Sequence, residues 1–264
     1  MNKQQRNKLN SIIKDNTSGS SELVNKINYL FIHNSDNNNV LKELISLLKK
    51  NLNHFAAVKN YLETVSNIIL AGSSNKLTKF LISSEATDIN KYQKLAEVFR
   101  TKYGMCNRLL TISRSGTLLI VFKHLASKNK KLRLIVLESR PTFEGRQMAK
   151  SLIDSGIKVE LITDAMMSYA VRNIDAVVIG ADKILKTGSV VNKVGSYPLA
   201  LLCKEFKKPY IVLSTKSKFS DQKLFKHKME NQSEVWNHKH KNLTVSNIYF
   251  EEINKNLITE IITI

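Results

Sequence analysis

The stretch Leu109–Leu119 reads LLTISRSGTLL: an apolar run is interrupted by Ser-Arg-Ser-Gly at residues 113–116 and then resumes. Short apolar runs that end at a polar turn containing glycine are typical of buried β-strands. Ser113 is then either a reactive group or only a turn residue. The choice depends on which other polar side chains reach the same place.

Four further runs of this kind follow, separated by helix-length periodic segments. They are LRLIVLE (132–138), KVELIT (158–163), DAVVIG (175–180) and YIVLS (210–214), in addition to RLLTI (108–112). Alternation of strands and helices indicates a parallel sheet with crossover helices, that is, a Rossmann-like domain. No GxGxxG follows the first run, so the dinucleotide fingerprint is absent.

The N-terminal part has a different pattern. Its apolar residues recur at the spacing of amphipathic helices, in one stripe at 40, 41, 44, 45 and 48 and another at 58, 62, 65 and 69. Natural turns are NSDNNN (34–39) and Gly72 to Asn75. The sequence therefore predicts an α/β protein: an N-terminal helical domain (1–105) followed by a Rossmann-like domain with a mainly parallel sheet (106–264).

Composition favours a globular protein: of 264 residues, 42% are hydrophobic and 24% charged. No apolar run reaches the roughly 18 residues of a membrane helix, and the first residues lack a secretory signal, so we expect a cytoplasmic protein without a membrane partner. Cys106 and Cys203 lack metal-binding or redox spacing, and we expect both to be buried apolar residues.

The net charge of +19 leaves two interpretations open. The densest segment, 216–241, holds seven lysines against three acids, and it is either a solvated surface or a site for a nucleic-acid or phosphate-rich partner. Nucleic acid is the less favoured partner because this interpretation rests on charge alone. His238 and His240 have no third ligand nearby, so no metal site is expected.

Polar residues follow each predicted strand, and ligands bind beyond the carboxyl ends of parallel strands. They are Ser113, Arg114, Ser115 and Gly116, then Ser139 and Arg140, then Asp164, then Asp182 and Lys183. Ser115 and Asp164 each precede a predicted helix, and N-capping is the ordinary alternative to a ligand-binding role for both residues. We expect an anionic ligand, with Arg114, Arg140 and Lys193 as phosphate partners and backbone N–H groups near Gly116 and Gly195 around it.

Four motifs resemble a known superfamily in their order and spacing: ESRP (138–141), EGR (144–146), GAD (180–182) and NKVGS (192–196). This superfamily contains the alpha, beta and delta regulatory subunits of translation initiation factor 2B, methylthioribose-1-phosphate isomerase and ribose-1,5-bisphosphate isomerase. The resemblance covers about residues 100–220, and the tail 247–263 is similar to the family's closing segment. GSSELVNKI (19–27) weakly resembles the family's first ligand-contacting turn, which adds Ser20 and Ser21 as ligand-binding candidates.

The resemblance implies a helical domain packed on a Rossmann-like domain with the ligand pocket between them, at least a homodimer formed through the C-terminal domains, and no cofactor. In the isomerases of the family, a cysteine after the first strand and the aspartate of GAD move a proton between adjacent sugar carbons. Asp182 matches that aspartate, and Asn192 and Lys193 match ligand-binding positions. The cysteine position falls on Ser113.

The serine weakens the case for catalysis, because a thiol has a pKa of about 8.5 whereas an aliphatic hydroxyl is a far weaker acid. Cys106 cannot replace it, since seven extended residues span roughly 23 Å. His124 lies along the following helix, outside the site motifs.

Three interpretations follow. The first is a regulatory or sensing protein that binds a phosphorylated sugar or nucleotide, with translation initiation factor 2 as a candidate partner. The second is a sugar-phosphate aldose–ketose isomerase in which Asp182 and a water molecule or Ser113 share the proton transfer. The third is a nucleic-acid-binding module.

Overall fold

The computed structural model describes residues 1–15, 18–53, 55–85 and 89–264. The chain divides into two compact units, one formed by Met1–Ile89 with Ser217–Phe219 and the other by Asn90–Lys216 with Ser220–Ile264. The sequence-based boundary between Met105 and Cys106 stays a prediction.

The first unit is helical, and its amphipathic stripes form the core as predicted. Its helices are α1 (Lys3–Ile13), α2 (Ser20–Ile32), α3 (Asn38–Leu52), α4 (Ala56–Leu70) and α5 (Ser74–Glu85). The apolar side chains at 41, 44, 45 and 48 on α3 and at 58, 62, 65 and 69 on α4 are buried, whereas Val40 is half-buried. Both predicted turns begin between helices, after α2 and after α4, but their last two residues, 38–39 and 74–75, already belong to α3 and α5.

A short piece of the C-terminal half completes this first unit. The side-chain amide of Asn60 on α4 donates to the carbonyl oxygens of Ser217 (2.9 Å) and Phe219 (3.0 Å). Between them, the buried Lys218 donates from its ammonium group to the hydroxyl of Ser20. Residues 217–219 therefore join α2 to α4 although they are distant from both in sequence.

The second unit contains a six-stranded sheet in which every pairing is parallel. The strand order is β3-β2-β1-β4-β7-β9, so the order reverses between β1 and β4. The strands are β1 (Arg108–Ile112), β2 (Arg133–Leu137), β3 (Lys158–Ile162), β4 (Ala176–Ile179), β7 (Tyr210–Ser214) and β9 (Glu260–Thr263). The first five coincide with the five predicted runs, which confirms the α/β fold class.

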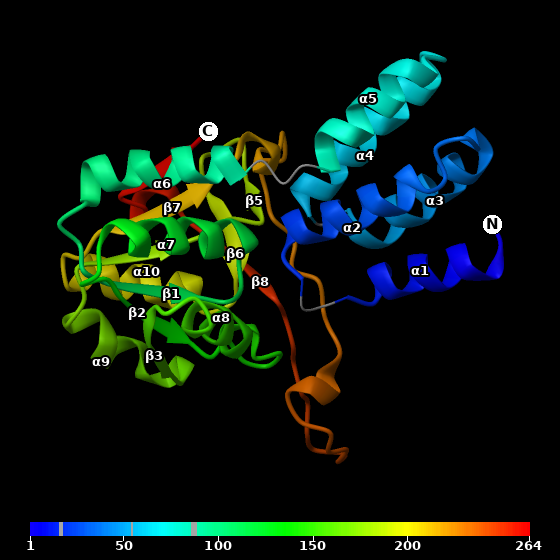
Figure 1. The fold of residues 1–264 in the computed structure, drawn as a ribbon. Coiled ribbons are helices and arrows are strands. Elements are labelled where there is room, and N and C mark those ends of the chain that lie inside the picture. The colour runs from blue at the N-terminus through cyan, green and yellow to red at the C-terminus, as the bar shows by residue number, and fades with distance from the viewer. Residues whose placement is uncertain (16–17, 54, 86–88) are drawn as a thin grey trace. The chain divides into compact units, whose positions relative to one another are not determined.

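Helices cover both faces of this sheet (Figure 1). On one face lie α6 (Ile89–Tyr103), α7 (Gly116–Lys128) and α8 (Glu144–Ile153), and on the other lie α9 (Met167–Arg172) and α10 (Ser196–Glu205). Short 3₁₀ turns occur at η1 (Asp164–Met166), η2 (Lys216–Lys218), η3 (Gln232–Glu234) and η4 (Lys255–Leu257). In doubly wound sheets ligands generally bind where the strand order reverses, and in this sheet that point lies beyond the carboxyl ends of β1 and β4.

A small antiparallel sheet stands beside the main one, and the sequence did not predict it. It has the order β5-β6-β8, with β5 (Lys183–Ile184), β6 (Val190–Lys193) and β8 (Phe250–Ile253). The residues after Asp182 therefore form a hairpin, and Lys193 is the last residue of its second strand.

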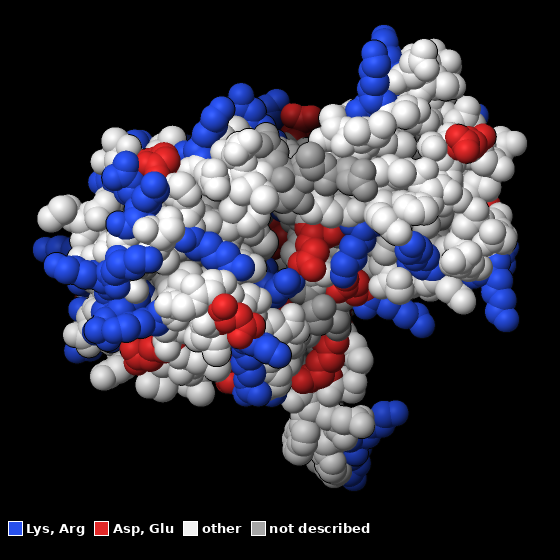
Figure 2. Space-filling view, viewed as in Figure 1, with Lys and Arg blue, Asp and Glu red and all other residues white. Residues whose placement is uncertain are grey.

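Charge is widely distributed over the surface. Figure 2 shows lysine and arginine side chains scattered over one face, with acidic side chains among them. In the part of the chain that the structure describes, no helix is both long and apolar enough to cross a membrane.

Candidate functional site

The ends of β1, β2 and β3 are joined by hydrogen bonds at the carboxyl edge of the parallel sheet. The backbone N–H of Ser113 donates to the hydroxyl of Ser139 at 2.8 Å. The carboxylate of Asp164 accepts from the backbone N–H groups of Ser139 (2.9 Å) and Arg140 (2.7 Å). The capping interpretation of Asp164 is wrong, because Asp164 is the first residue of η1 and Thr163 is the N-cap. Its carboxylate instead fixes the loop after β2 and holds the backbone of Arg140 in place.

Two of these residues have left-handed backbone conformations. The φ angle is 64° at Ser113, the first residue after β1, and 65° at Ser139, the second residue after β2. Such conformations cost about 1 kcal/mol or more for residues with a side chain, and they are enriched at functional sites. Their occurrence just beyond the ends of two adjacent strands marks this edge as a candidate site.

The start of α7 lies at the reversal point between β1 and β4. Ser115 caps α7 by accepting from the N–H of Leu118 at 3.3 Å, so the capping interpretation of this serine is confirmed. A Cβ at Gly180, which follows β4, would lie 3.0 Å from the Ser115 hydroxyl oxygen, so the two strand ends approach closely there. A Cβ at Gly116 would meet nothing within 4 Å, so the first residue of α7 faces open space.

The Asp182, Asn192 and Lys193 candidates lie on or next to the β5–β6 hairpin. Asp182 is half-buried and donates from its backbone N–H to Val191 at 2.9 Å, which places it beside β6. Asn192 is buried, and its amide donates to the Ser196 hydroxyl at 2.9 Å. The hairpin therefore carries all three candidates, and the next residues lead directly into α10.

Lys193 forms a buried ion pair that the sequence did not predict. Its ammonium nitrogen lies 2.6 Å from Oε1 of Glu144, donates to the Thr142 hydroxyl at 3.1 Å and lies 4.4 Å from the centre of the Tyr249 ring. Glu144 is the first residue of α8, after β2. This pair links β6 to the loop after β2, where Arg140 lies.

Arg140 extends its guanidinium group toward the segment around η3. One Nη donates to the carbonyl oxygen of Val235 at 3.3 Å, and the guanidinium carbon lies 4.9 Å from the centre of the Phe143 ring. Arg146 packs on the same ring at 3.9 Å and pairs with Glu138 at 2.7 Å. The ESRP and EGR motifs thus form one cluster of cations around Phe143.

The N-terminus of α10 differs from our expectation. The backbone N–H groups of Gly195 (2.6 Å) and Tyr197 (2.8 Å) both donate to Oε1 of Glu251, a residue of β8. The expected role of the Gly195 N–H in holding an external anion is therefore wrong for this structure, because the chain's own carboxylate fills that position. Burial raises the pKa of Glu251, and the backbone N–H groups partly oppose the increase.

Ser20 and Ser21 belong to the first unit. They begin α2, and the Ser20 hydroxyl accepts from Lys218. The ligand-binding roles assigned to these two serines stay predictions.

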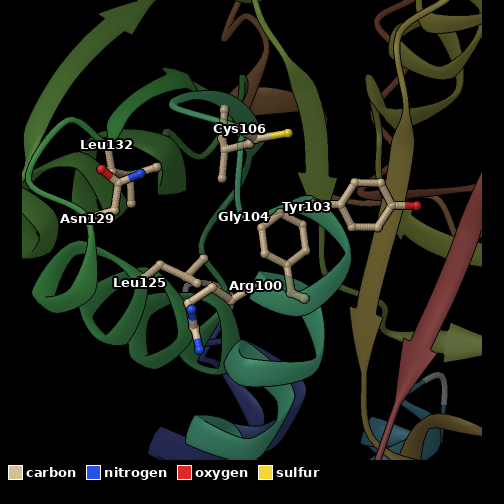
Figure 3. A pocket seen from close by; sticks show the side chains of 9 residues that line it. Arg100, Tyr103, Gly104, Cys106, Leu125, Asn129 and Leu132 are labelled. Carbon is tan, nitrogen blue, oxygen red and sulfur yellow. The ribbon is translucent and has the colours of Figure 1, made fainter.

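Neither cysteine belongs to the candidate site. Cys106 precedes β1 at the opposite edge of the sheet, beside a small cavity of about 20 Å³ that Arg100, Tyr103 and Asn129 also line (Figure 3). It is half-buried, not fully buried as expected, and burial raises the pKa of its thiol. Cys203 is buried as expected, and burial raises its thiol pKa to about 12.

The histidines also lie outside the site. His238 and His240 are exposed, and His124 pairs with Glu97 at 2.6 Å between α7 and α6. Among the residues that the structure describes, no three His, Cys, Asp or Glu side chains group as metal ligands.

Comparison with known proteins agrees with the motifs and the fold. The family model described as Initiation factor 2 subunit family matches residues 6–263. The chain belongs to this family. A search of solved structures finds the translation initiation factor eIF-2B of Pyrococcus horikoshii at a TM-score of 0.83 and 24% identity, covering 99% of this chain and 95% of that one. The 5-methylthioribose 1-phosphate isomerase of the same organism superposes at a TM-score of 0.81 and 17% identity, covering 98% and 82%.

Curated members of the initiation factor 2 subunit family match this chain over shorter stretches. The ribose 1,5-bisphosphate isomerase of Archaeoglobus fulgidus is 34% identical over 50% of this chain and 42% of its own length. A putative translation initiation factor eIF-2B subunit 2-like protein of Pyrococcus horikoshii is 40% identical over 42% of this chain and 40% of its own. The methylthioribose-1-phosphate isomerase of Bacillus licheniformis is 37% identical over 44% and 34%. The chain thus matches less than half the length of each of these relatives.

Sequence reasoning named Ser139 among the polar residues after the second strand but missed two other groups in this site. Glu144 pairs with Lys193, and Glu251 accepts hydrogen bonds from backbone N–H groups at the start of α10. Glu144 lies inside the EGR motif, which the sequence had already singled out, so motif position was its signal. Glu251 had no comparable signal, because only the β6–β8 pairing brings it to α10.

Proposed function

We propose that this chain binds a phosphorylated sugar or nucleotide at the carboxyl edge of the second unit's parallel sheet and acts as a sensor rather than as a catalyst. Three observations support ligand binding. Ser113, Arg140 and Asp182 follow the carboxyl ends of the parallel strands β1, β2 and β4. A hydrogen bond joins Ser113 to Ser139, and Lys193 pairs with Glu144 on the segment that follows β2. A hydroxyl at position 113, where the resemblance places a thiol, supports sensing, because the hydroxyl is a poor proton-transfer group at neutral pH. Relatives named as initiation factor subunits are consistent with this role.

Binding is tested by titrating the purified protein with ribose 1,5-bisphosphate, methylthioribose 1-phosphate and AMP. At least one of them raises the melting temperature, because a ligand that binds only the folded state stabilises it. Arg140→Met weakens binding about 10-fold or more, since charge-assisted hydrogen bonds to phosphate are lost. Arg133→Met is the matched control, because Arg133 lies at the other end of the same strand β2.

Two results would contradict this proposal. One is a melting temperature that none of the three ligands changes at millimolar concentration. The other is equal loss of affinity in Arg140→Met and Arg133→Met, which would place the phosphate away from the carboxyl edge.

A second candidate is an aldose–ketose isomerase of phosphorylated sugars. Retention of Asp182 beside the hairpin favours it, as do relatives named ribose 1,5-bisphosphate and methylthioribose-1-phosphate isomerase. In this case Asp182 and a water molecule or Ser113 share the proton transfer.

Turnover separates the two candidates. Ketose formation from ribose 1,5-bisphosphate or methylthioribose 1-phosphate is followed with the wild type, Asp182→Asn and Ser113→Ala. The sensor proposal expects binding without ketose. Ketose formation that Asp182→Asn abolishes would replace it with the isomerase, and Ser113→Ala would then show whether the hydroxyl takes part.

We also propose that the protein works in the cytoplasm as a homodimer or larger oligomer, with translation initiation factor 2 as a candidate partner. A solved relative is described as a tetrameric complex of eIF2B beta and delta subunits. Light scattering of the protein as it elutes from a size-exclusion column measures its mass in solution. A mass of about 30 kDa, the mass of one chain, would contradict the oligomer.

A further inference from the structure

The starting observation is a cavity that the proposed function does not use. It has a volume of about 300 Å³, and the described residues that line it all fall between 231 and 245, in the segment that projects from the second unit (Figure 1, orange). Pockets for small organic ligands have volumes from roughly 300 Å³ upward. Among the lining residues are Trp236, His238, Lys239 and three residues with side-chain amides, Asn231, Gln232 and Asn237.

Hydrogen bonds hold the base of this 231–245 loop in one arrangement. The backbone N–H of Glu230 donates to the carbonyl oxygen of Asn247 at 2.9 Å. The side-chain amide of Asn247, a buried residue, donates to the carbonyl oxygen of Asn231 (2.7 Å) and to the carboxylate of Glu234 (3.0 Å). The loop is therefore already ordered without a ligand, and a ligand that binds there loses less affinity to the ordering of the chain.

Trp236 supplies an accessible aromatic ring in this cavity. It stacks on the imidazole of His238, with ring centroids 4.8 Å apart and planes inclined by 21°, and yet it is 58% exposed. An indole that a second ring supports is a platform for a planar ligand, because nucleic-acid bases stack on aromatic side chains whatever their identity. Side-chain amides can both donate to and accept from the edge of such a base.

The charge around the cavity favours an anionic ligand. Lys239 is exposed, and the described residues that line the cavity include no acid. The two acids of residues 228–245 are already bonded: Glu230 pairs with Lys228 at 3.1 Å, and Glu234 accepts from Asn247. A planar ring beside a cation fits a base that carries a phosphate, whereas a second copy of this basic chain would bring like charge to the same place.

We propose that the 231–245 loop binds a nucleotide, with the base stacked on Trp236 and the phosphate near Lys239. This site goes beyond the proposed function, because it does not use the carboxyl edge of the sheet. Arg140 contacts the loop at the carbonyl oxygen of Val235 and is not among the residues that line the cavity. A free mononucleotide and an unpaired base of RNA share this chemistry, and the small cavity with its single indole commits the proposal to the mononucleotide.

The test uses Trp236 as its own probe, because it is the one tryptophan of the chain. Titration with AMP quenches the tryptophan fluorescence and saturates, since a stacked base changes the surroundings of the indole. Ribose 5-phosphate, which lacks the base, leaves the fluorescence unchanged. Adenosine, which lacks the phosphate, quenches it but binds about 2- to 5-fold more weakly, as expected for the loss of an exposed ion pair.

Two variants assign the binding to the loop by titration calorimetry. Every titration contains millimolar ribose 5-phosphate, which occupies the carboxyl edge if the proposed function holds. Trp236→Leu weakens AMP binding about 5- to 100-fold, as expected for the loss of one stacked base. Lys239→Gln lowers the affinity for AMP to that for adenosine and leaves adenosine binding unchanged.

Tyr169→Leu is the matched control for Trp236→Leu. Tyr169 is also an exposed aromatic residue, at 61%, but it lies on α9. Its substitution leaves the affinity for AMP unchanged, because it does not line the cavity. Unfolding curves establish that each variant is folded before titration.

Four outcomes would overturn this site. AMP does not quench Trp236, or Trp236→Leu and Tyr169→Leu bind AMP equally well. Ribose 5-phosphate abolishes the quenching by AMP, which would place AMP at the carboxyl edge and support the proposed function alone. A six-nucleotide oligoadenylate binds more than about 10-fold more tightly than AMP at high salt, where counterion release contributes least, which would assign the loop to RNA. Trp236→Leu lowers the mass in solution, which would make the loop a contact between subunits.

Discussion

Glu251 shows how one residue determines where an anion can bind. Its carboxylate accepts from two backbone N–H groups at the start of α10, the position where a helix ordinarily attracts an external anion. A phosphate would have to displace this carboxylate and would meet its charge. At Gly116, the first residue of α7, an added Cβ would meet no atom of the described residues within 4 Å. We therefore expect a phosphate to approach α7 and Arg140 rather than α10.

Glu251 also predicts a dependence of stability on pH. Burial raises the pKa of Glu251 in the folded state above its usual value. Between the unfolded and folded pKa values the folded protein holds a proton that the unfolded chain has released. This contribution to stability is fully present below the unfolded pKa and is lost as the pH rises through the folded pKa.

Urea unfolding of the wild type and Glu251→Gln from pH 4 to pH 8 measures this effect. The difference in unfolding free energy between them should change across this range, with the wild type losing stability relative to the variant as the pH rises. Parallel pH profiles for the two proteins would contradict this assignment.

At the scale of elements, two glycines at helix starts predict opposite effects. Gly195 has a φ of 101°, and a Cβ there would lie 2.9 Å from Cδ1 of Ile112, whereas Gly116 has open space. Gly195→Ala should lower the free energy of unfolding by about 1–3 kcal/mol, because a residue with a side chain is strained at this φ, whereas the Cδ1 end of Ile112 can shift to make room. Gly116→Ala should leave stability unchanged or raise it by up to about 1 kcal/mol.

Thermal and chemical unfolding of both variants measures the contrast. Equal stability of Gly195→Ala and the wild type would mean that the turn before α10 can relax. Because Gly116→Ala leaves the fold intact, any loss of ligand affinity in this variant can be assigned to the filled space at α7.

The elements also show what the sequence could and could not predict. Five strands of the main sheet, β1, β2, β3, β4 and β7, were found because each contains a short run rich in apolar residues. Most of these residues are buried, except in the edge strand β3, where only Ile162 is fully buried. β5 has only two residues, and β6 contains Asn192 and Lys193, so neither has the pattern of a buried strand. Lys193 can be buried because Glu144 neutralises it, and the tertiary fold supplies that partner.

The same limit applies to the candidate site. Strand order predicts that Ser113, Arg140 and Asp182 lie at one edge, since parallel strands end on the same side. It does not predict that Glu144 pairs with the ammonium group of Lys193 or that Glu251 accepts from the backbone N–H of Gly195. These partners meet only after the helices and the small sheet have packed.

At the scale of the whole molecule, the net charge of +19 acts on every polyanion in solution. Lysine and arginine side chains are spread over the face shown in Figure 2, and the segment 216–241 is largely exposed. Such a distribution attracts nucleic acid through its phosphates without a specific site. A small ligand that carries one or two phosphates depends much less on this effect.

Salt dependence therefore separates non-specific from specific binding. Affinity for a 20-nucleotide single-stranded RNA should fall about 300-fold between 50 and 200 mM salt if about six phosphates are contacted. Affinity for ribose 5-phosphate should fall less than about 10-fold over the same range, because fewer ions are released.

A matched pair of variants decides whether the basic segment is special. One variant replaces four lysines of the basic segment by Gln: Lys223, Lys226, Lys239 and Lys241. The other replaces four lysines of the first unit by Gln: Lys42, Lys50, Lys76 and Lys79. All eight lysines are exposed. If charge alone attracts RNA, both variants weaken RNA binding by similar factors, since each removes four charges from the same total. Loss confined to the first variant would instead make 216–241 a nucleic-acid site, because position and not only net charge would then determine the affinity.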